Sequence, residues 1–452
     1  MLAGIVRKIA LSNRDITPVK LIALTGLSIL VTLFINYLLA EQVTPDQYGA
    51  WRLFLMIASF SGFFHFGFAD GINIQWLFSD RSNWQKSAKR DFVYFLIQQT
   101  ALYGIVIFVL HSQLFPQIKT FSIHEICLAN QILLQNSIGL IQSFFNRAQK
   151  FYHGVVLTLF GQIVFCLGII FYRAGYLATL DLILLSNIQL VAVAIPMLYL
   201  LSREIEQSPM LDRRDFHFKK FFYAFRKSVG VGFPILLTGL VFLGFQNIDK
   251  LLISSYYPAT DFGYYAFASA LLNVVLTLVV SVSNFLMQKM AYSRNSIEIY
   301  YNKSVKSVSI LFSVLLISIL PLQWIATKII PAYSDSMLYL TYLAGSIAPY
   351  VLIQLIQFNM FKVLQKQHFF LALSIPVFGM IAGAIWLLVL NMVSLTCIAF
   401  ISASMSYSWY IASDVLLCFI NPELKRHQSQ RYLHVVVTYI SYLFIIFINF
   451  LW

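Results

Sequence analysis

Thirteen apolar stretches, each about as long as one helical membrane crossing, dominate this chain of 452 residues. A bilayer has a hydrocarbon core about 30 Å thick, which an α-helix of about 20 residues spans. Backbone groups in lipid must be hydrogen-bonded within their own segment, so each stretch is expected to be a helix. The sequence therefore predicts an all-α, polytopic membrane protein. The predicted crossings are Lys20–Ala40, Ala50–Asp70, Asp91–His111, Ile126–Phe145, Gly154–Phe171, Leu177–Leu200, Val231–Ser254, Phe262–Gln288, Val305–Ile325, Met337–Met360, Phe369–Leu390, Val393–Ile420 and Leu433–Leu451.

The segments between the crossings alternate between rich and poor in Lys and Arg. With thirteen crossings, 26 of the 31 basic residues fall on one side of the membrane. Because basic loops stay cytoplasmic, we expect the N-terminus inside and Trp452 outside. Five basic residues fall on the other side or at the nearby helix ends: Arg52, Lys119, Arg173, Lys250 and Lys328.

The composition agrees with a membrane protein, since the chain is 59% hydrophobic and only 11% charged. The net charge of +13 is explained by the orientation signal, so we expect no nucleic-acid partner. The first apolar stretch is long and lacks a small-residue cleavage site, which predicts a retained helix rather than a signal peptide. The four cysteines lie inside crossings, without metal-site spacing, and are expected to be packing residues.

Two outer turns suggest that the chain contains a repeat. Glu41–Trp51 reads EQVTPDQYGAW and Ser255–Tyr265 reads SYYPATDFGYY, so Gly49 aligns with Gly263 at an offset of 214 residues. Six crossings separate the two turns, which gives the copies the same orientation. Two unrelated outer turns would be the alternative. The predicted division is an N-terminal six-helix bundle (1–201), a cytoplasmic linker (202–230), a C-terminal six-helix bundle (231–420), and a loop with an additional C-terminal helix (421–452).

The predicted linker is basic and aromatic, because Asp212–Lys227 reads DRRDFHFKKFFYAFRK. A short helix of this composition lies in the membrane interface near anionic lipid. Alternatively it is a stiff connection that orients the next crossing. Membrane lipids are expected partners on either interpretation.

Polar side chains recur on single faces of several crossings. In the eighth crossing they are Ser269, Asn273, Thr277, Ser281, Asn284 and Gln288, and in the fourth they are Gln131, Gln135, Gln142 and Asn146. Such groups either bond neighbouring helices together, at about 1 kcal/mol per contact, or line a wet cavity. The long polar face of the eighth crossing favours a cavity there. The fourth crossing fits both interpretations.

Charged residues within or beside crossings are rarer. Arg52 follows the first outer turn, and Asp249 and Lys250 lie in the outer half of the seventh crossing. The two cations suit an anionic substrate, or they reach the outer headgroups by snorkelling, or Lys250 forms a local pair with Asp249. Asp414, in the twelfth crossing, carries a coupling proton or forms a hydrogen bond within its bundle.

Sequence signatures of catalysis are missing. The chain has no Walker A loop and no GxSxG, HExxH or CxxC motif. We therefore expect neither an enzyme nor a bound metal or cofactor, and the polar crossings point to transport.

At this point the residues resemble a family. Two features are similar to the polysaccharide-transporter branch of the multidrug/oligosaccharidyl-lipid/polysaccharide (MOP) exporter superfamily: the turn with Pro45, Tyr48 and Gly49, and the segment Phe66–Gly71. The second half resembles Wzx-type O-antigen flippases in its order of segments, which are Gly232–Pro234, Asp249–Ile253 and Pro258–Tyr264. The resemblance covers twelve crossings in two bundles of six, and the thirteenth departs from the usual even counts.

The resemblance implies a MATE-like fold and a flippase for undecaprenyl-pyrophosphate-linked oligosaccharides in the bacterial inner membrane. A polysaccharide polymerase and a chain-length regulator would be partners. Family cavities are lined by the first, second, seventh and eighth crossings. On this basis the substrate-binding residues would be Arg52, Lys250, Asn36, Gln246, Asn273, Thr277 and Asn284, with Asp249 coupling transport to an ion gradient.

Two alternatives stay open. A multidrug exporter of the same superfamily would want an acidic cavity for cationic drugs, whereas the few buried charges here lean basic. A membrane glycosyltransferase or polymerase would want catalytic acids and large outer loops, and the predicted outer loops are short.

Overall fold

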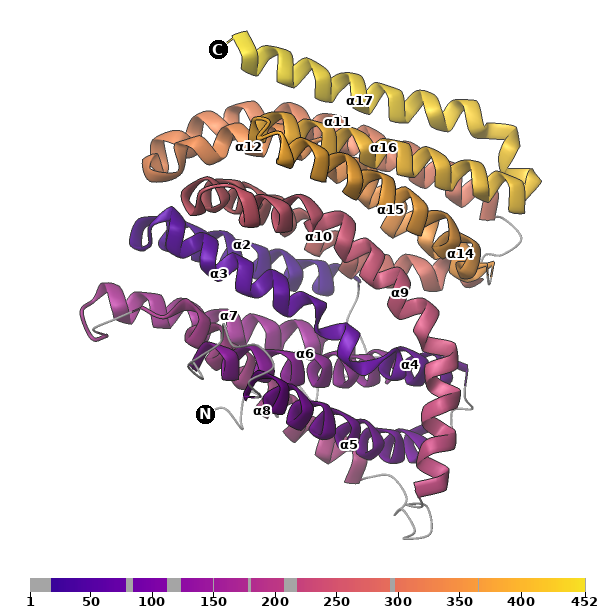
Figure 1. Cartoon of the computed structure of the whole chain (residues 1–452). Coiled ribbons are helices and arrows are strands. Elements are labelled where there is room, and N and C mark those ends of the chain that lie inside the picture. Colours follow the sequence, from indigo (N-terminus) through magenta and orange to yellow (C-terminus); the bar gives the residue numbers. More distant parts are fainter. Residues whose placement is uncertain are drawn as a thin grey trace. The chain divides into compact units, whose positions relative to one another are not determined.

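The computed structural model describes residues 18–78, 84–111, 123–148, 150–177, 180–206, 218–292, 297–364 and 366–451. All regular secondary structure within these ranges is helical, which confirms the predicted all-α class (Figure 1). The helices of the first half are α2 (Pro18–Gln42), α3 (Pro45–Ser59), η1 (Phe60–His65), α4 (Phe68–Phe78), α5 (Trp84–His111), α6 (Ile123–Arg147), α7 (Phe151–Arg173) and α8 (Leu182–Glu206).

The second half begins with the two longest helices of the described residues. Its helices are α9 (Phe218–Tyr256), α10 (Ala259–Tyr292), α11 (Ile297–Ile329), η4 (Pro331–Tyr333), α12 (Ser334–Ala344), α13 (Ile347–Val351), η5 (Leu352–Gln357), α14 (Phe358–Val363), α15 (Gln367–Leu390), α16 (Leu395–Ile420), η6 (Pro422–His427) and α17 (Gln428–Leu451).

The helices coincide with the predicted crossings. In the described residues, eight helices are long and apolar enough to span a membrane, or up to ten if each of two bent pairs is one span. The other three predicted crossings fall on α5, α6 and α10, which have 28, 25 and 34 residues. The chain is a multi-pass membrane protein, and the number of thirteen crossings stays a prediction.

Two crossings that we expected to be continuous are broken. Between η1 and α4, Phe66 and Gly67 have φ of 50° and 78°, and the helix axes differ by 65°. Between α12 and α13 the bend is 52° and lies at Gly345. A Cβ on Gly67 would come within 2.5 Å of the Phe233 backbone, and one on Gly345 within 2.5 Å of the Tyr442 ring. Both breaks therefore occur where another helix approaches closely, which hydropathy along the sequence does not show.

The predicted interfacial linker helix is also different in the structure. Residues 207–217 of the linker lie outside the described residues, and from Phe218 onward the chain is already the first turn of α9. Phe222 and Tyr223 are exposed there, whereas Phe221 and Phe225 pack against an aromatic core. The basic aromatic segment thus continues directly into the seventh crossing.

The chain's contacts define two compact units. Unit 1 comprises the described residues up to Ile35 and those of Phe54–Leu240, and unit 2 comprises Asn36–Leu53 and the described residues from Val241 onward. The predicted bundle boundaries stay a prediction, and the contacts place the middle of α2, α3 and α9 at the division.

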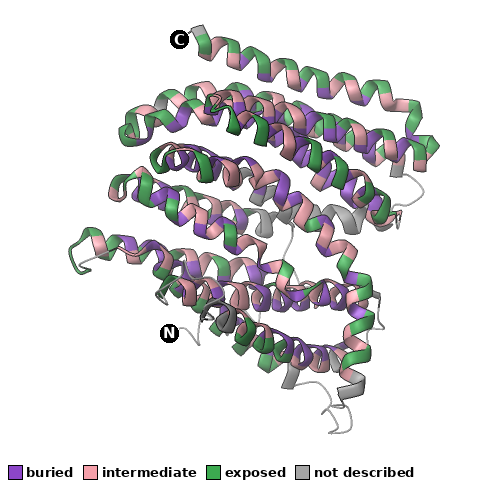
Figure 2. Ribbon diagram, in the orientation of Figure 1, coloured by how far each residue is buried: buried purple, intermediate pink, exposed green. Residues whose placement is uncertain are grey.

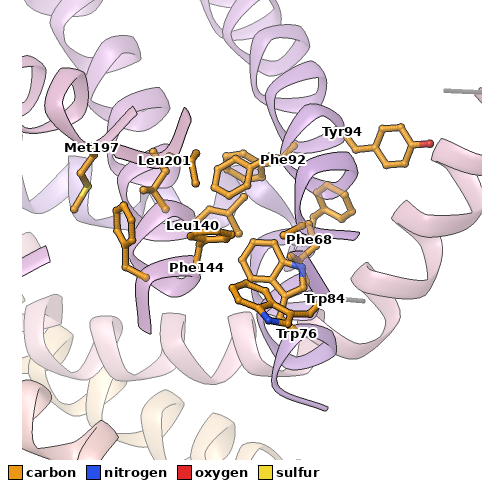
Figure 3. Close-up of a cluster of buried hydrophobic side chains, with 14 of the residues drawn as sticks. Phe68, Trp76, Trp84, Phe92, Tyr94, Leu140, Phe144, Met197 and Leu201 are labelled. Atoms are coloured by element: carbon orange, nitrogen blue, oxygen red, sulfur yellow. The ribbon is translucent and has the colours of Figure 1, made fainter. Parts of the chain in front are cut away.

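Unit 1 is built on a buried aromatic cluster (Figure 3). Phe144 of α6 contacts the rings of Trp76, Trp84 and Phe92, with centroids 5.1–6.2 Å apart. Aromatic pairs at these separations stabilise a core by about 0.5–1.5 kcal/mol each beyond the area they bury. The cluster joins α4, α5, α6 and α8 and fixes the positions of the unit's helices.

Unit 2 has an aromatic core of its own. Trp409 of α16 stacks on Phe245 of α9, with ring centroids 3.7 Å apart and an angle of 7° between the planes. The Trp409 indole also donates a hydrogen bond to Ser374 of α15 at 3.2 Å. The buried indole nitrogen is thereby satisfied, and α9, α15 and α16 are joined.

Within each unit, glycines allow the backbones of two helices to come very close together. Gly49 and Gly263, aligned in the predicted repeat, are the fifth residues of α3 and α10, and a Cβ on Gly49 would lie 3.2 Å from the Gly263 Cα. A Cβ on Gly263 would lie 2.1 Å from the Pro45 carbonyl oxygen. In unit 1, a Cβ on Gly232 of α9 would lie 1.9 Å from the Gly67 oxygen. Only glycine fits at such backbone-to-backbone contacts.

Large apolar side chains remain exposed along many helices. Figure 2 colours all exposed residues green. On α17 they include Val436, Phe444 and Phe447. Lipid tails are as apolar as these side chains, so their exposure is the ordinary outer surface of a membrane helix.

Candidate functional site

A small cavity of about 30 Å³ in unit 2 brings together four of the predicted site residues: Gln246, Asp249, Lys250 and Asn273. Gln246, Asp249 and Lys250 are at helical spacings i, i+3 and i+4 and so share one face of α9. Ser269 and Asn273 share a face of α10 for the same reason. The cavity is completed by side chains from α12, α13 and α16 and from the turn between α12 and α13.

Asp249 and Lys250 form an ion pair inside the cavity. The Lys250 ammonium lies 3.2 Å from Asp249 Oδ1 and also donates to the Gln246 carbonyl oxygen. The Lys250 backbone N–H donates to the same Oδ1 at 2.9 Å, and the Tyr265 hydroxyl donates to Oδ2 at 2.7 Å. Both carboxylate oxygens therefore have partners, and a single ammonium balances the negative charge.

The wall behind the ion pair is joined to neighbouring helices by a hydrogen bond and a ring stack. Tyr350 of α13 lines the cavity and donates from its hydroxyl to the Phe245 carbonyl oxygen at 2.8 Å. Phe245 in turn stacks on Trp409. These contacts join the Asp249 turn of α9 to α13 and α16.

Two other predicted site residues are placed elsewhere. Asn36 of α2 is buried, and its Oδ1 accepts a hydrogen bond from the Tyr48 hydroxyl at 2.8 Å. The guanidinium of Arg52 in α3 lies 5.7 Å from the Trp51 ring centroid, and neither residue lines the cavity. Thr277 and Asn284 belong to α10, but their side chains lie outside the described part of the chain.

The structure separates the two interpretations of the polar faces. In α2, Thr32 and Ser28 hydrogen-bond to the amide of Gln162 in α7 at 2.9 and 2.8 Å. In α6, Gln135 bonds to Ser61 and Gln131. These polar groups in unit 1 join helices, whereas Ser269 and Asn273 of α10 line a cavity. The other four side chains of the predicted polar face of the eighth crossing lie outside the described part of the chain.

Asp414 is held in a second buried ion pair. Its carboxylate accepts from Arg431 of α17, with Nε to Oδ1 at 3.0 Å and Nη2 to Oδ2 at 3.2 Å, and both side chains are almost fully buried. Tyr301 of α11 donates to the same carboxylate. The geometry thus favours the bundle-bonding interpretation of Asp414, with Arg431 fastening the additional C-terminal helix to α16.

Several cavity residues were not anticipated from the sequence. Ser346 lies in the break between α12 and α13, Tyr350 follows it by one turn, and Ser402 belongs to α16. The small polar run Ser402, Ser404, Ser406 and Ser408 in the twelfth crossing was a usable signal for one of them. The break itself gave no such signal.

No family model matches the sequence, and no curated protein sequence matches it either. Among solved structures, the chain is similar to the lipid II flippase MurJ in an inward closed conformation, with a TM-score of 0.61 and 13% identity over 96% of this chain and 99% of that one. A multidrug resistance MATE family transporter of the MOP superfamily, inward-facing, gives a TM-score of 0.64 and 12% identity over 88% and 96% of the chains.

A third similar structure is a MOP superfamily transporter from Pyrococcus furiosus Vc1 (DSM3638), described as having a binding pocket of reverse polarity. It gives a TM-score of 0.55 and 11% identity over 90% of this chain and 96% of that one. The chain has the MOP transporter fold. The match extends over almost the whole length of each structure, and it confirms the predicted MATE-like architecture.

Proposed function

We propose that the chain is a MOP superfamily flippase that carries undecaprenyl-pyrophosphate-linked oligosaccharide repeat units, of O-antigen or a related surface polysaccharide, from the inner to the outer leaflet of the bacterial inner membrane. The observation that carries this proposal is the cavity in unit 2, in which an ammonium lies among amides and hydroxyls. The similar structure of MurJ, a lipid II flippase, supports a lipid-linked cargo.

The lining suits the head of such a cargo. Gln246, Asn273 and the serines offer amide and hydroxyl groups that both donate and accept, as sugar hydroxyls do. The Lys250 ammonium attracts phosphate or an acidic sugar, and the low dielectric of the surroundings strengthens that attraction. The lipid tail stays in the bilayer. Transport then proceeds by alternating access, coupled to an ion gradient through Asp249.

A multidrug exporter is the second candidate, because similar structures include MATE transporters. A cationic drug would need a carboxylate without a resident cation. Asp249 already binds Lys250 and Tyr265, so the cavity offers a drug no such group. A membrane glycosyltransferase or polymerase is disfavoured by the sequence, which lacks the expected catalytic motifs and large outer loops.

The test is export of the glycan in a deletion strain that carries variants of the gene. Lys250→Ala is expected to lower surface glycan and to accumulate lipid-linked oligosaccharide in the inner leaflet, with the protein still in the membrane. Lys328→Ala is the matched control, because this predicted outer-side lysine packs on the Trp324 ring and does not line the cavity. Wild-type surface glycan with Lys250→Ala would contradict the proposed site.

Drug sensitivity of the deletion strain separates the two transporter classes. A flippase for lipid-linked glycan predicts unchanged resistance to cationic drugs and altered surface polysaccharide. Increased drug sensitivity with normal surface polysaccharide would instead establish the multidrug exporter.

A further inference from the structure

The cavity of unit 2 is smaller than the cargo head proposed for it. Its volume of about 30 Å³ accommodates about two water molecules, whereas a sugar ring or a pyrophosphate has many more non-hydrogen atoms. Protein interiors are close-packed, so space for such a group arises only when a wall of the cavity moves. Binding of the head therefore requires that one of the surrounding helices can move.

The walls of the cavity differ in regularity. The lining segments of α9, α10 and α16 belong to α-helices of 39, 34 and 26 residues. By contrast, α13 has only five residues, Ile347–Val351, and irregular backbone bounds it at both ends. The chain bends by 52° before it, at Gly345, and the π-helix η5 follows it directly. Such π-helical turns are rare and occur frequently at functional sites.

Few polar contacts hold α13 in place. Four of its five side chains are apolar, and the fifth is Tyr350. Pro349 has no N–H to donate to the Gly345 carbonyl oxygen, so the helical hydrogen bond into the bend is missing. The Tyr350 hydroxyl donates to the Phe245 carbonyl oxygen of α9 at 2.8 Å. Because the other side chains of α13 have no polar atoms, this bond is the side-chain hydrogen bond that joins α13 to the facing wall.

The chain is anchored on both sides of this segment. Before α13, the Tyr442 ring of α17 lies against Gly345, and the Tyr442 hydroxyl donates to the last turn of α12 at 2.7 Å. After η5, the Gln357 amide donates to the carbonyl oxygen of Tyr410 in α16 at 3.1 Å. Movement between these two anchors therefore involves α13 and η5, and it carries Tyr350 of the cavity lining with it.

We propose that α13 is the movable wall of the cavity and that the hydrogen bond from Tyr350 to Phe245 keeps this wall closed. This deepens the proposed function and rests on it. When the bond breaks, α13 moves away from α9, and the amides and hydroxyls of the cavity become accessible to a sugar or a phosphate. Cargo then binds the open state, and its apparent affinity is the intrinsic affinity multiplied by the fraction of molecules that are open.

The experiment compares Tyr350→Phe with the wild type, as full-length proteins in nanodiscs, with undecaprenyl pyrophosphate as the probe. A hydrogen bond favours the closed state by a factor of about five, which the variant loses. Tyr350→Phe is therefore expected to bind the probe about fivefold more tightly. A hydroxyl that held the cargo directly would have the opposite effect, so weaker binding by Tyr350→Phe overturns the proposal.

The matched control is Tyr407→Phe. The buried Tyr407 hydroxyl of α16 has no hydrogen-bond partner among the described residues, and it does not line the cavity. This variant is expected to bind the probe like the wild type. Equal affinity of Tyr350→Phe and Tyr407→Phe would also overturn the proposal, because it would mean that the bond to Phe245 does not limit binding.

Amide hydrogen exchange without the probe measures the movement itself. Peptides that cover residues 347–357 are expected to exchange faster in Tyr350→Phe than in the wild type, with unchanged exchange in α16. Unchanged exchange of residues 347–357 overturns the movable wall and leaves the flippase proposal standing. A wild-type protein that does not bind the probe overturns the flippase proposal. If Tyr350→Phe does not fold, the wild type decides: exchange of residues 347–357 that is as slow as that of α16 refutes the movement.

Discussion

The close contact between helices α3 and α10 permits a quantitative prediction for a substitution at Gly263. A Cβ at this position would lie 2.1 Å from the Pro45 carbonyl oxygen and 2.5 Å from the Pro45 carbonyl carbon. An ordinary carbon-to-oxygen contact is about 3.3 Å, so Gly263→Ala requires the two helices to separate by about 1.2 Å. The obstacle is backbone, which no change of side-chain rotamer relieves.

Two opposing contributions set the change in the free energy of unfolding for Gly263→Ala. Overpacking of a tight contact costs about 1–3 kcal/mol. Alanine in place of glycine inside a helix stabilises by up to about 1 kcal/mol. The matched control is Gly383→Ala in α15, because a Cβ on Gly383 meets nothing within 4 Å. The control retains the propensity gain without the clash, so the two variants are expected to differ by about 1–3 kcal/mol.

The assay is unfolding of the purified variants in mixed detergent micelles, followed by tryptophan fluorescence. Gly263→Ala is expected to unfold at a lower denaturant fraction than Gly383→Ala, and Gly263→Leu at a still lower one. Equal stability of Gly263→Ala and Gly383→Ala would refute the steric reasoning, because it would mean that α3 and α10 are not in backbone contact.

Three further predictions concern other contacts. Gly232→Ala in α9 should lower stability more than Gly230→Ala in the same unfolding assay, because only the first Cβ meets backbone atoms, at 1.9 Å; equal effects would contradict the contact. Asp414→Asn should cost about 3–5 kcal/mol, since it leaves the Arg431 guanidinium buried without its carboxylate, and an unchanged unfolding midpoint would contradict this ion pair. Gln162→Leu removes hydrogen bonds between α2 and α7 and should cost about 1–2 kcal/mol in that assay, whereas a gain would show that packing outweighs them.

Much of the fold could be predicted from the sequence. Hydropathy and length are properties of a single segment, and they decide whether that segment can span a bilayer as a helix. The same holds for part of the site. The spacing of Gln246, Asp249 and Lys250 places them on one face of a helix whatever that helix contacts. Ser269 and Asn273, two of the six polar residues on one face of the eighth crossing, line the cavity.

Asn36 and Thr32 show why the rest could not be predicted. Each lies on a polar face like that of α10, yet Asn36 bonds to Tyr48 and Thr32 to Gln162. A polar side chain in a membrane helix is satisfied by whichever group lies opposite, and that group belongs to a distant segment. Arg431, predicted only as a cytoplasmic charge, is buried for the same reason, because Asp414 lies across from it.

By itself, the sequence determined that this protein resides in a bilayer as a set of helices, and which faces of those helices are polar. The tertiary structure decided where two crossings break, which glycines meet backbone, and which helices close the cavity beside Asp249 and Lys250. The physical reason is that insertion of a helix into lipid depends on the composition of that one segment. A contact between helices depends on how close the fold brings two segments that are far apart in the sequence.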